Sequence, residues 1–320
     1  MTQIFRRIVV AIDRSRAANQ ATELAMRLAR THESELLFVH AVDYSLFAGE
    51  GDHDILDAVT RNGNDILRQA KERAANAGVP SRAVLVEGRA DVAVTRYAEE
   101  IAADAIVVGT RGPAASERFF LGSTAEGILR LAIAPVFIVH DVPLSPSPAF
   151  KRIVVAIDNS DPADAAVELG TRLAGMDGSS RLAFCHVVDE ETLYEEAANF
   201  GGATYPVLQE WLDEAAILSR SAAGEAEGNG VHGVETSVLT GNPVSEILNF
   251  ASTHAADLIV IGAHGRRGLR HLVMGSVAQG VVRRSAIPVL VVRTRVAAAV
   301  APALHPHVDH HGYVTMRTDV

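Results

Sequence analysis

The sequence predicts an α/β fold built as two tandem domains, each an open five-stranded parallel sheet with helices on both faces. The run RRIVVAID at residues 6–13 returns almost unchanged as KRIVVAID at 151–158, which indicates a tandem duplication. Both runs are continuously apolar rather than alternating, a pattern typical of a strand that is covered on both faces of a parallel sheet. A glycine-rich loop also follows a later apolar run in each half, with the same spacing.

Length, charge and cysteine content narrow the class of protein. A chain of 320 residues fits two domains of ordinary size, and its hydrophobic content of 48% is enough for well-buried cores. The net charge of −10 argues against a nucleic-acid-binding protein, which would need a basic face. The sequence has no apolar stretch long enough to span a membrane and begins with a strand pattern rather than a signal peptide, so we expect a cytoplasmic protein. The single cysteine, Cys185, lies in an apolar run and is expected to be a buried, unreactive thiol.

In the first half, apolar runs alternate with helical patterns in the order β-α-β-α-β-α-β-α-β. Ser15 can cap the first helix, whose apolar residues Leu24 and Leu28 fall at helical spacing. A polar segment at 44–54 is expected to form a loop over the sheet before a long helical pattern. The five strands of this half are expected at 6–13, 36–43, 83–86, 106–108 and 136–139.

The second half follows the same order. Asp161 is expected to cap its first helix, with Pro162 at the first helical position, where a backbone N–H group has no partner within the helix. The polar segment at 190–205 corresponds to the loop of the first half and also precedes a long helical pattern. The five strands of this half are expected at 151–158, 182–189, 236–239, 258–261 and 289–292.

These patterns set the expected domain boundaries. The first domain is placed at residues 1–142 and the second at 150–295. Three prolines in the linker at 143–149 disfavour both helix and sheet pairing, so a short, stiff connection is expected. Residues 296–320 show no periodic pattern and are interpreted as a flexible tail.

The clearest functional motif is the stretch GAHGRRGLRHLVMGS at 262–276, which follows the apolar run 258–261. Its spacing, G-x2-G-x9-G-S, recurs at Gly109, Gly112, Gly122 and Ser123. Glycines at a strand end let a ligand approach bare backbone amides, and the final Gly-Ser pair opens a helix whose N-terminus favours phosphate. The motif is neither of the two commonest phosphate loops, because no lysine follows a glycine as in G-x-x-x-x-G-K-[ST] and no G-x-G-x-x-G follows the first strand.

This motif lies late in a domain whose first strand ends in Asp13 or Asp158, and the combination closely resembles the ATP-binding signature of the universal stress protein family. The resemblance covers nearly all residues up to Thr294. It implies an adenine nucleotide alpha hydrolase-like fold with sheet order 3-2-1-4-5, in which strands one and four leave a ligand crevice at their carboxyl ends. It also implies that the protein binds ATP as a Mg²⁺ complex and acts as a nucleotide-dependent regulatory or stress-response module. The missing dinucleotide fingerprint favours this adenine nucleotide over a flavin or a nicotinamide dinucleotide.

The family's residue roles carry over to matching positions of this sequence. Asp13 and Asp158 would lie near the ribose and adenine, while the motif glycines and serines would wrap the phosphates. Ala41 and Val187 would meet the adenine, although relatives usually carry valine at the position of Ala41. The candidate nucleotide-binding residues are Ala11, Asp13, Ala41, Val108, Gly109, Arg111, Gly112, Gly122, Ser123 and Thr124 in the first half, and Ala156, Asp158, Val187, Ile261, Gly262, His264, Gly265, Arg266, Gly275, Ser276 and Val277 in the second.

The resemblance also bears on assembly, because the family usually dimerises through its last strand. Here the runs at 136–139 and 289–292 could pair within one chain as an intrachain pseudo-dimer, covering two edges that would otherwise promote aggregation. A homodimer stays open as a further assembly.

The two sites are expected to be unequal, with the second half binding ATP more tightly. Fewer cations face the phosphates in the first half, where Pro113 also removes an amide donor and Glu117 adds a negative charge. The second loop, by contrast, carries Arg266, Arg267, Arg270 and His271. On this basis Gly262→Val or Gly275→Val is expected to remove most tight ATP binding, and Gly109→Val only a weaker component.

Other interpretations stay open at this point. The glycine loops could be purely structural, which would make the protein a nucleotide-free scaffold, and the two aspartates could be helix caps. No Ser/His/Asp spacing or catalytic carboxylate pair indicates an enzyme, but slow ATP hydrolysis is a third alternative. His40 and His186 lie in apolar runs and are expected to be core residues. No metal site is predicted, because histidines on a flexible tail have no neighbours to orient them.

Overall fold

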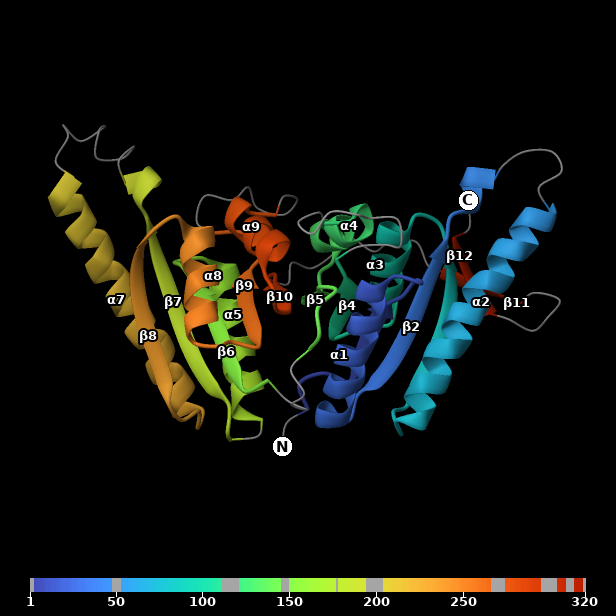
Figure 1. Ribbon diagram of the computed structural model, residues 1–320, viewed down its shortest axis with the longest axis horizontal. Helices are drawn as coiled ribbons and strands as arrows, with labels where there is room; N and C mark the ends of the chain where they lie inside the picture. The colour runs from blue at the N-terminus through green and yellow to red at the C-terminus, as the bar shows by residue number, and fades with distance from the viewer. Residues whose placement is uncertain are drawn as a thin grey trace. The chain divides into compact units, whose positions relative to one another are not determined.

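The computed structural model describes residues 3–47, 53–110, 121–144, 150–176, 178–193, 204–265, 274–294, 304–308 and 314–318. The chain divides into two compact units, one of residues Thr2–Pro148 with Arg295–Val320 and one of residues Ala149–Thr294 with Met1. Figure 1 shows the elements of each unit as a twisted sheet flanked by helices. Pairing of the last strands of the two halves stays a prediction.

The first unit has the predicted sheet. Its five predicted strands run in the order β3-β2-β1-β4-β5, and each neighbouring pair among these five is parallel. Helices α1 and α2 cover one face and α3 and α4 the other, as right-handed crossovers on either side of β1 require (Figure 1). The elements are β1 (Arg7–Ala11), α1 (Arg16–His32), β2 (Glu35–Val42), a 3-10 turn (Tyr44–Phe47), α2 (His53–Asn76), β3 (Ser81–Glu87), α3 (Ala90–Glu100), β4 (Ala105–Gly109), α4 (Ser123–Leu131) and β5 (Val136–Val139).

The second unit repeats this topology. Its parallel strands run in the order β8-β7-β6-β9-β10, with α5 and α7 on one face and α8 and α9 on the other. The elements are β6 (Arg152–Ile157), α5 (Asp161–Gly175), β7 (Arg181–Asp189), α7 (Thr204–Gly228), β8 (Val234–Gly241), α8 (Pro243–Thr253), β9 (Leu258–Gly262), α9 (Ser276–Arg284) and β10 (Val289–Val292).

The duplication extends to side-chain chemistry at the amino end of each sheet. In the first unit the Asp104 carboxylate accepts hydrogen bonds from the backbone amides of Arg6 and Arg7, at 2.8 and 2.9 Å. In the second unit Asp257 accepts from Lys151 and Arg152 in the same way, at 2.8 and 3.0 Å. Each aspartate therefore ties the start of its unit's first strand to the fourth strand.

Helix starts agree with the prediction in one unit and shift by one residue in the other. The Ser15 side chain accepts a hydrogen bond from Ala18 N at 3.0 Å, as a capping serine should. In the second unit the N-cap is Ser160 rather than Asp161, and Asp161 is the first helical residue. Pro162 is therefore the second helical residue and not the first as predicted, although it still lies in the first turn, where proline is tolerated.

The carboxy-terminal segment differs from the expectation of a flexible tail. Strands β11 (Leu304–Val308) and β12 (Val314–Thr318) form an antiparallel hairpin, and β12 pairs in parallel with β3. An edge strand offers unpaired backbone groups to any extended segment that can reach it, a long-range effect that local periodicity does not reveal. Pro306 lies in the outer strand β11, where a missing N–H group is tolerated.

The burial of His32 gives the first unit a predictable response to pH. The His32 side chain is only 4% exposed, its ring packs edge-on against Phe5, and its burial lowers the pKa of His32 from 6.5 to about 4. Because the unfolded chain takes up the proton first, the free energy of unfolding should fall by about 3 kcal/mol as the pH drops from about 6.5 to 4. Urea denaturation at pH 7 and pH 4.5 tests this: the loss should shrink in His32→Leu and persist in His232→Leu, whose histidine is exposed. Equal losses in both variants would contradict it.

Candidate functional site

A cavity of about 760 Å³ lies at the carboxyl ends of β6, β7 and β9 in the second unit. Its walls come from these strand ends and from α7, α8 and the N-terminus of α9. The candidate residues of the second half that the structure describes all line it, namely Ala156, Asp158, Val187, Ile261, Gly262, His264, Gly265, Gly275, Ser276 and Val277. Arg266 lies outside the described residues, as do Arg267, Arg270 and His271.

The glycine motif of the second unit links the end of β9 to the start of α9. The backbone amide of Gly275 donates a 2.8 Å hydrogen bond to the carbonyl of Ala263, which closes the base of the loop. Gly275 is the N-cap of α9, and no side chain among the described residues accepts a capping hydrogen bond there. The first amides of α9 are therefore available to an anion, which the helix dipole also favours.

The first unit has the same loop base. The amide of Gly122 donates to the carbonyl of Thr110 at 2.7 Å, and Gly122 is the N-cap of α4. The remaining candidates occupy matching places: Ala11 ends β1, Asp13 follows it, Ala41 lies in β2, Val108 and Gly109 end β4, and Ser123 and Thr124 begin α4. Arg111 and Gly112 lie outside the described residues, as do Pro113 and Glu117.

The aspartate that follows the first strand meets the glycine loop in the second unit. Asp158 is half-buried, and one of its carboxylate oxygens accepts a hydrogen bond from the Ser160 hydroxyl. A Cβ atom added at Gly265 would collide with the other oxygen. A side chain at position 265 would therefore require the Asp158 carboxylate to move, so the two halves of the sequence motif lie close together here.

A profile of the universal stress protein family matches residues 4–140 and again 149–293. The chain belongs to the universal stress protein family. Its relatives include a universal stress protein of Mycolicibacterium smegmatis, 26% identical over 298 residues (90% of this chain, 97% of the relative), and one of Mycobacterium tuberculosis strain CDC 1551, 27% identical over 305 residues (89% and 94%). The crystal structure of a universal stress protein from Archaeoglobus fulgidus covers 90% of this chain and 98% of its own, with a TM-score of 0.67 and 22% identity. A solved universal stress protein in complex with cAMP, 25% identical, covers 45% of this chain and 98% of its own with a TM-score of 0.32.

The first glycine of each motif has a structural role that differs from the one predicted. A Cβ atom added at Gly109 would lie 2.6 Å from the carbonyl carbon of Ala17 in α1, and one at Gly262 would lie 3.0 Å from the corresponding atom of Pro162 in α5. These glycines let the first helix of each unit pack closely on the fourth strand. The prediction that Gly262→Val fills phosphate space stays untested, but a Cβ atom at this position would also meet α5, so the variant would perturb packing as well.

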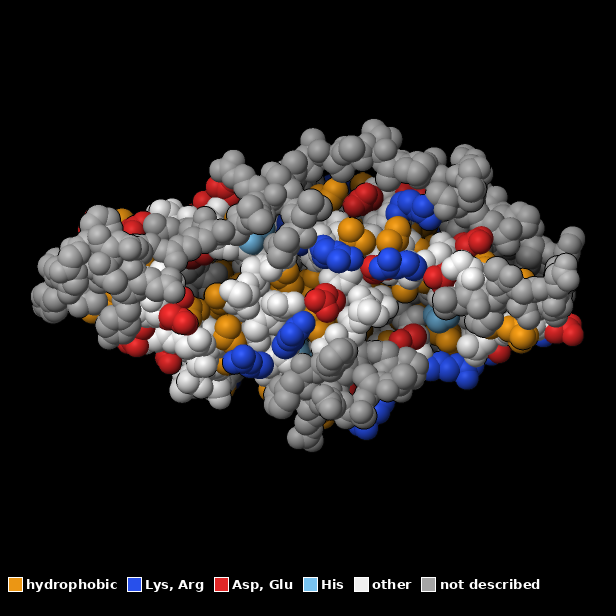
Figure 2. All heavy atoms as spheres, turned by 90° about the horizontal axis from the view of Figure 1, so that it is seen from above, with side chains coloured by type: hydrophobic (Ala, Val, Ile, Leu, Met, Phe, Trp, Pro, Cys, Tyr) orange, Lys and Arg blue, Asp and Glu red, His pale blue; other side chains and the backbone are white. Residues whose placement is uncertain are grey.

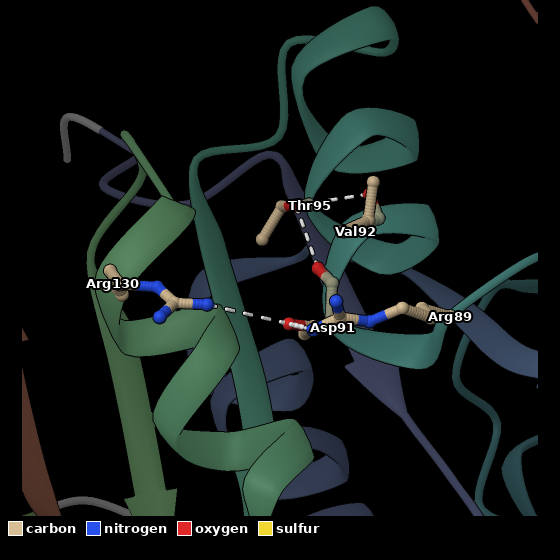
Figure 3. Close-up of polar contacts among 5 residues, drawn as sticks. All are labelled: Arg89, Asp91, Val92, Thr95 and Arg130. Carbon is tan, nitrogen blue, oxygen red and sulfur yellow. Dashed lines mark hydrogen bonds and ion pairs between the residues drawn. The ribbon is translucent and has the colours of Figure 1, made fainter.

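The two units of this universal stress protein use different side chains to position the helix that follows the glycine loop, α4 in the first unit and α9 in the second. In the first unit Asp91, which is 5% exposed, accepts a 2.9 Å hydrogen bond from Arg89 and forms a 3.9 Å ion pair with Arg130 of α4 (Figure 3). A Cβ atom at Gly127 of α4 would collide with Asp91. In the second unit the matching pair is apolar: a Cβ atom at Gly280 of α9 would lie 2.6 Å from Val244.

Several residues that line the cavity were not predicted. Helix α7 contributes Trp211, Glu214 and Ala215. Glu214 and Ala215 follow Trp211 by three and four residues, so all three lie on one side of the helix. This spacing is visible in the sequence. Which face of α7 points toward the cavity could not be predicted, because it depends on how the helix packs on the sheet. Other unpredicted lining residues are Ile157, Ala163, Cys185, His186, Val188, Asp189, Thr192, Pro243, Ile247, Met274 and Ala278.

The described part of the cavity lining is acidic and contains no lysine or arginine. Its three carboxylates have local partners: Asp158 as above, Asp189 with the Thr192 hydroxyl at 3.0 Å, and Glu214 with the Asn159 amide at 3.0 Å. Figure 2 shows that acidic and basic side chains are interspersed among the described residues of the surface it draws. An anionic ligand at this site would depend on backbone amides, and on cations that lie outside the described residues.

The buried thiol agrees with the sequence prediction, and the strand histidine agrees with it only in part. Cys185 is 1% exposed, and burial raises the pKa of its thiol to about 12, so it stays protonated and unreactive at neutral pH. His40 Nδ1 lies 2.8 Å from the carbonyl oxygen of Ile12, so the ring has the predicted partner, but the residue is half-buried and not part of the core. His186, in contrast, lines the cavity.

Within the described ranges, no three histidine, cysteine or acidic side chains gather closely enough to hold a metal ion. The structure does not describe the side chains of the tail histidines. Among the described helices, none is both long and apolar enough to cross a membrane.

Proposed function

We propose that this universal stress protein binds ATP as its Mg²⁺ complex and that occupancy acts as a regulatory or stress-response signal in the cytoplasm. The observation that supports this most strongly is the cavity of the second unit, where Asp158 and the glycine loop meet. Its volume of about 760 Å³ lies within the range of about 300–1,000 Å³ that is usual for small-molecule sites.

The residues present suit the parts of an adenine nucleotide. Ala156, Val187 and Ile261 offer an apolar wall to the base. The Asp158 carboxylate is an acceptor of the kind that ribose hydroxyls need. The loop amides and the uncapped start of α9 suit the phosphates. Mg²⁺ prefers oxygen ligands and keeps several waters, so phosphate oxygens would bring it to the site without a set of protein ligands.

Experiments on the purified protein also test two other functions. A nucleotide-free scaffold is favoured by the packing roles of Gly109 and Gly262, which explain those glycines without any ligand. Slow ATP hydrolysis would require only a positioned water beside bound phosphates. Nucleotide extracted from the purified protein and identified by chromatography should be ATP or ADP, and turnover with added Mg²⁺ then separates a binder from an ATPase. Protein that carries no nucleotide and gains no thermal stability from added ATP would support the scaffold.

The first turns of α4 and α9 differ in charge, which supports the proposal that the two sites bind ATP unequally. Helix α4 carries Glu126 in its first turn, whereas α9 carries Gln279 at the matching position and no acidic residue in that turn. A carboxylate near a helix N-terminus repels a bound phosphate, and at an exposed position this repulsion is about 1 kcal/mol or less. The first half is therefore the weaker proposed site for two reasons, its loop sequence and Glu126.

Exchanging these two residues tests the inequality. We expect Gln279→Glu to weaken the tighter ATP-binding component by about two- to fivefold, and Glu126→Gln to strengthen the weaker one by a similar factor. Isothermal titration at low and high salt measures both, and the differences should shrink as salt screens the added charge. An unchanged tight component in Gln279→Glu would count against this electrostatic contribution.

A further inference from the structure

Trp211 is the only tryptophan of the chain, and helix α7 places it on the wall of the cavity. Its side chain is half-buried, so part of the indole surface stays accessible. An indole ring offers a large, flat, apolar face, and such rings in pockets bind best to other flat ring systems. Nothing in the glycine motif or the strand-end aspartate accounts for a tryptophan here.

The part of α7 around Trp211 is connected to the rest of the unit at two points. Ala215, one turn further along α7, is fully buried, so the helix packs against the body of the unit at this point. Glu214 accepts a 3.0 Å hydrogen bond from Asn159, the residue next to Asp158. One hydrogen bond therefore links the face of α7 that carries Trp211 to the loop that carries the proposed ribose-binding carboxylate.

The first half has no counterpart of this residue. Both long helices end in the same hydrogen bond, from Val79 N to Ala74 O in the first unit and from Val231 N to Ala226 O in the second. Aligning the helices on this bond puts Val59 of α2 at the position of Trp211. Valine cannot stack on a ring, so this contact belongs to the second half alone.

We propose that Trp211 is a base-recognition residue, which stacks on the heterocyclic base of the nucleotide and makes the second site selective for ligands with a purine ring. This inference rests on the proposed function of the site and names a residue that neither half of the motif includes. Stacking acts on the base and not on the phosphates, so Trp211 separates recognition of the ring from recognition of the charge.

Two titrations test the role of Trp211. Addition of Mg²⁺-ATP to the unmodified protein should change tryptophan emission, which can come only from Trp211, whereas inorganic triphosphate should leave it nearly unchanged. In isothermal titration, Trp211→Ala should weaken ATP binding by about tenfold or more, and Trp211→Phe should keep most of the affinity. Affinity for inorganic triphosphate should be the same in all three proteins, and Val59→Ala should leave the tight ATP component unchanged.

The outcomes of these titrations that would overturn base recognition by Trp211 can be stated in advance. Equal weakening of ATP and triphosphate in Trp211→Ala would show a role in maintaining the wall and would overturn base recognition. Unchanged ATP affinity in that variant would overturn it as well. If the unmodified protein bound triphosphate but showed no preference for ATP, base recognition alone would fail; if it bound neither, the proposed function would fail with it. Thermal unfolding of each variant checks that the fold is kept.

Discussion

Val187→Trp is expected to abolish the tighter component of ATP binding, weakening it by at least about 100-fold, or roughly 3 kcal/mol. Val187 lies near the carboxyl end of β7, lines the cavity and is half-buried, so a larger side chain can extend into the cavity instead of into the core. Its backbone is held by parallel pairing with Leu239 of β8, which keeps the strand in place after the substitution. The indole would then occupy the space proposed for the adenine.

A matched variant in the first half separates the two sites. Ala41 is the counterpart of Val187, and Ala41→Trp should remove only a weaker binding component. Isothermal titration of Mg²⁺-ATP into both variants makes the comparison, with circular dichroism as the check on folding. A tight component that survives Val187→Trp, or that is lost in Ala41→Trp, would contradict the placement of the tighter site in the second half.

Gly109→Ala is expected to lower the free energy of unfolding by about 3 kcal/mol, the upper part of the usual range for overpacking. The added Cβ atom would lie 2.6 Å from the carbonyl carbon of Ala17 and 2.8 Å from the amide nitrogen of Ala18, so backbone atoms of α1 would have to move. Gly262→Ala should cost less, because its closest backbone atoms in α5 lie at 3.0 and 3.1 Å. These glycines therefore test the fold, and Val187 is the better position for testing the ligand.

Gly224→Ala provides the control for this prediction. Gly224 lies within α7, and a Cβ atom there would have no neighbour within 4 Å among the described residues. Alanine is favoured over glycine in a helix, so this variant should gain up to about 1 kcal/mol. Urea denaturation of the three variants gives the ranking. A Gly109→Ala protein as stable as Gly224→Ala would show that α1 can move away from β4 at little cost.

The fold was predictable because its signals are local and repeated. The continuous apolar runs that contain Val9 and Val154 identify buried parallel strands without any knowledge of their neighbours. Ser15 located a helix start in the same way. The strands near the carboxy terminus were missed because β12 is defined by the free edge of β3, a partner far away in the sequence.

Only those contacts of the candidate site that follow from the strand topology could be predicted from the sequence. Asp158 and Gly265 meet because the carboxyl ends of parallel strands share one edge of the sheet, which follows from topology. Trp211 was missed because its place depends on how α7 lies over the sheet. The packing role of Gly109 was missed for a related reason, since the distance between α1 and β4 appears only in three dimensions.

The most direct test of the account is a calorimetric titration of the unmodified protein with Mg²⁺-ATP and, separately, with NAD. A cavity with one glycine loop and no dinucleotide fingerprint after its first strand should bind ATP more tightly than NAD. We expect a tight ATP component from the second half and a weaker one from the first. NAD binding tighter than ATP, or no ATP binding at all, would contradict the proposed nucleotide site.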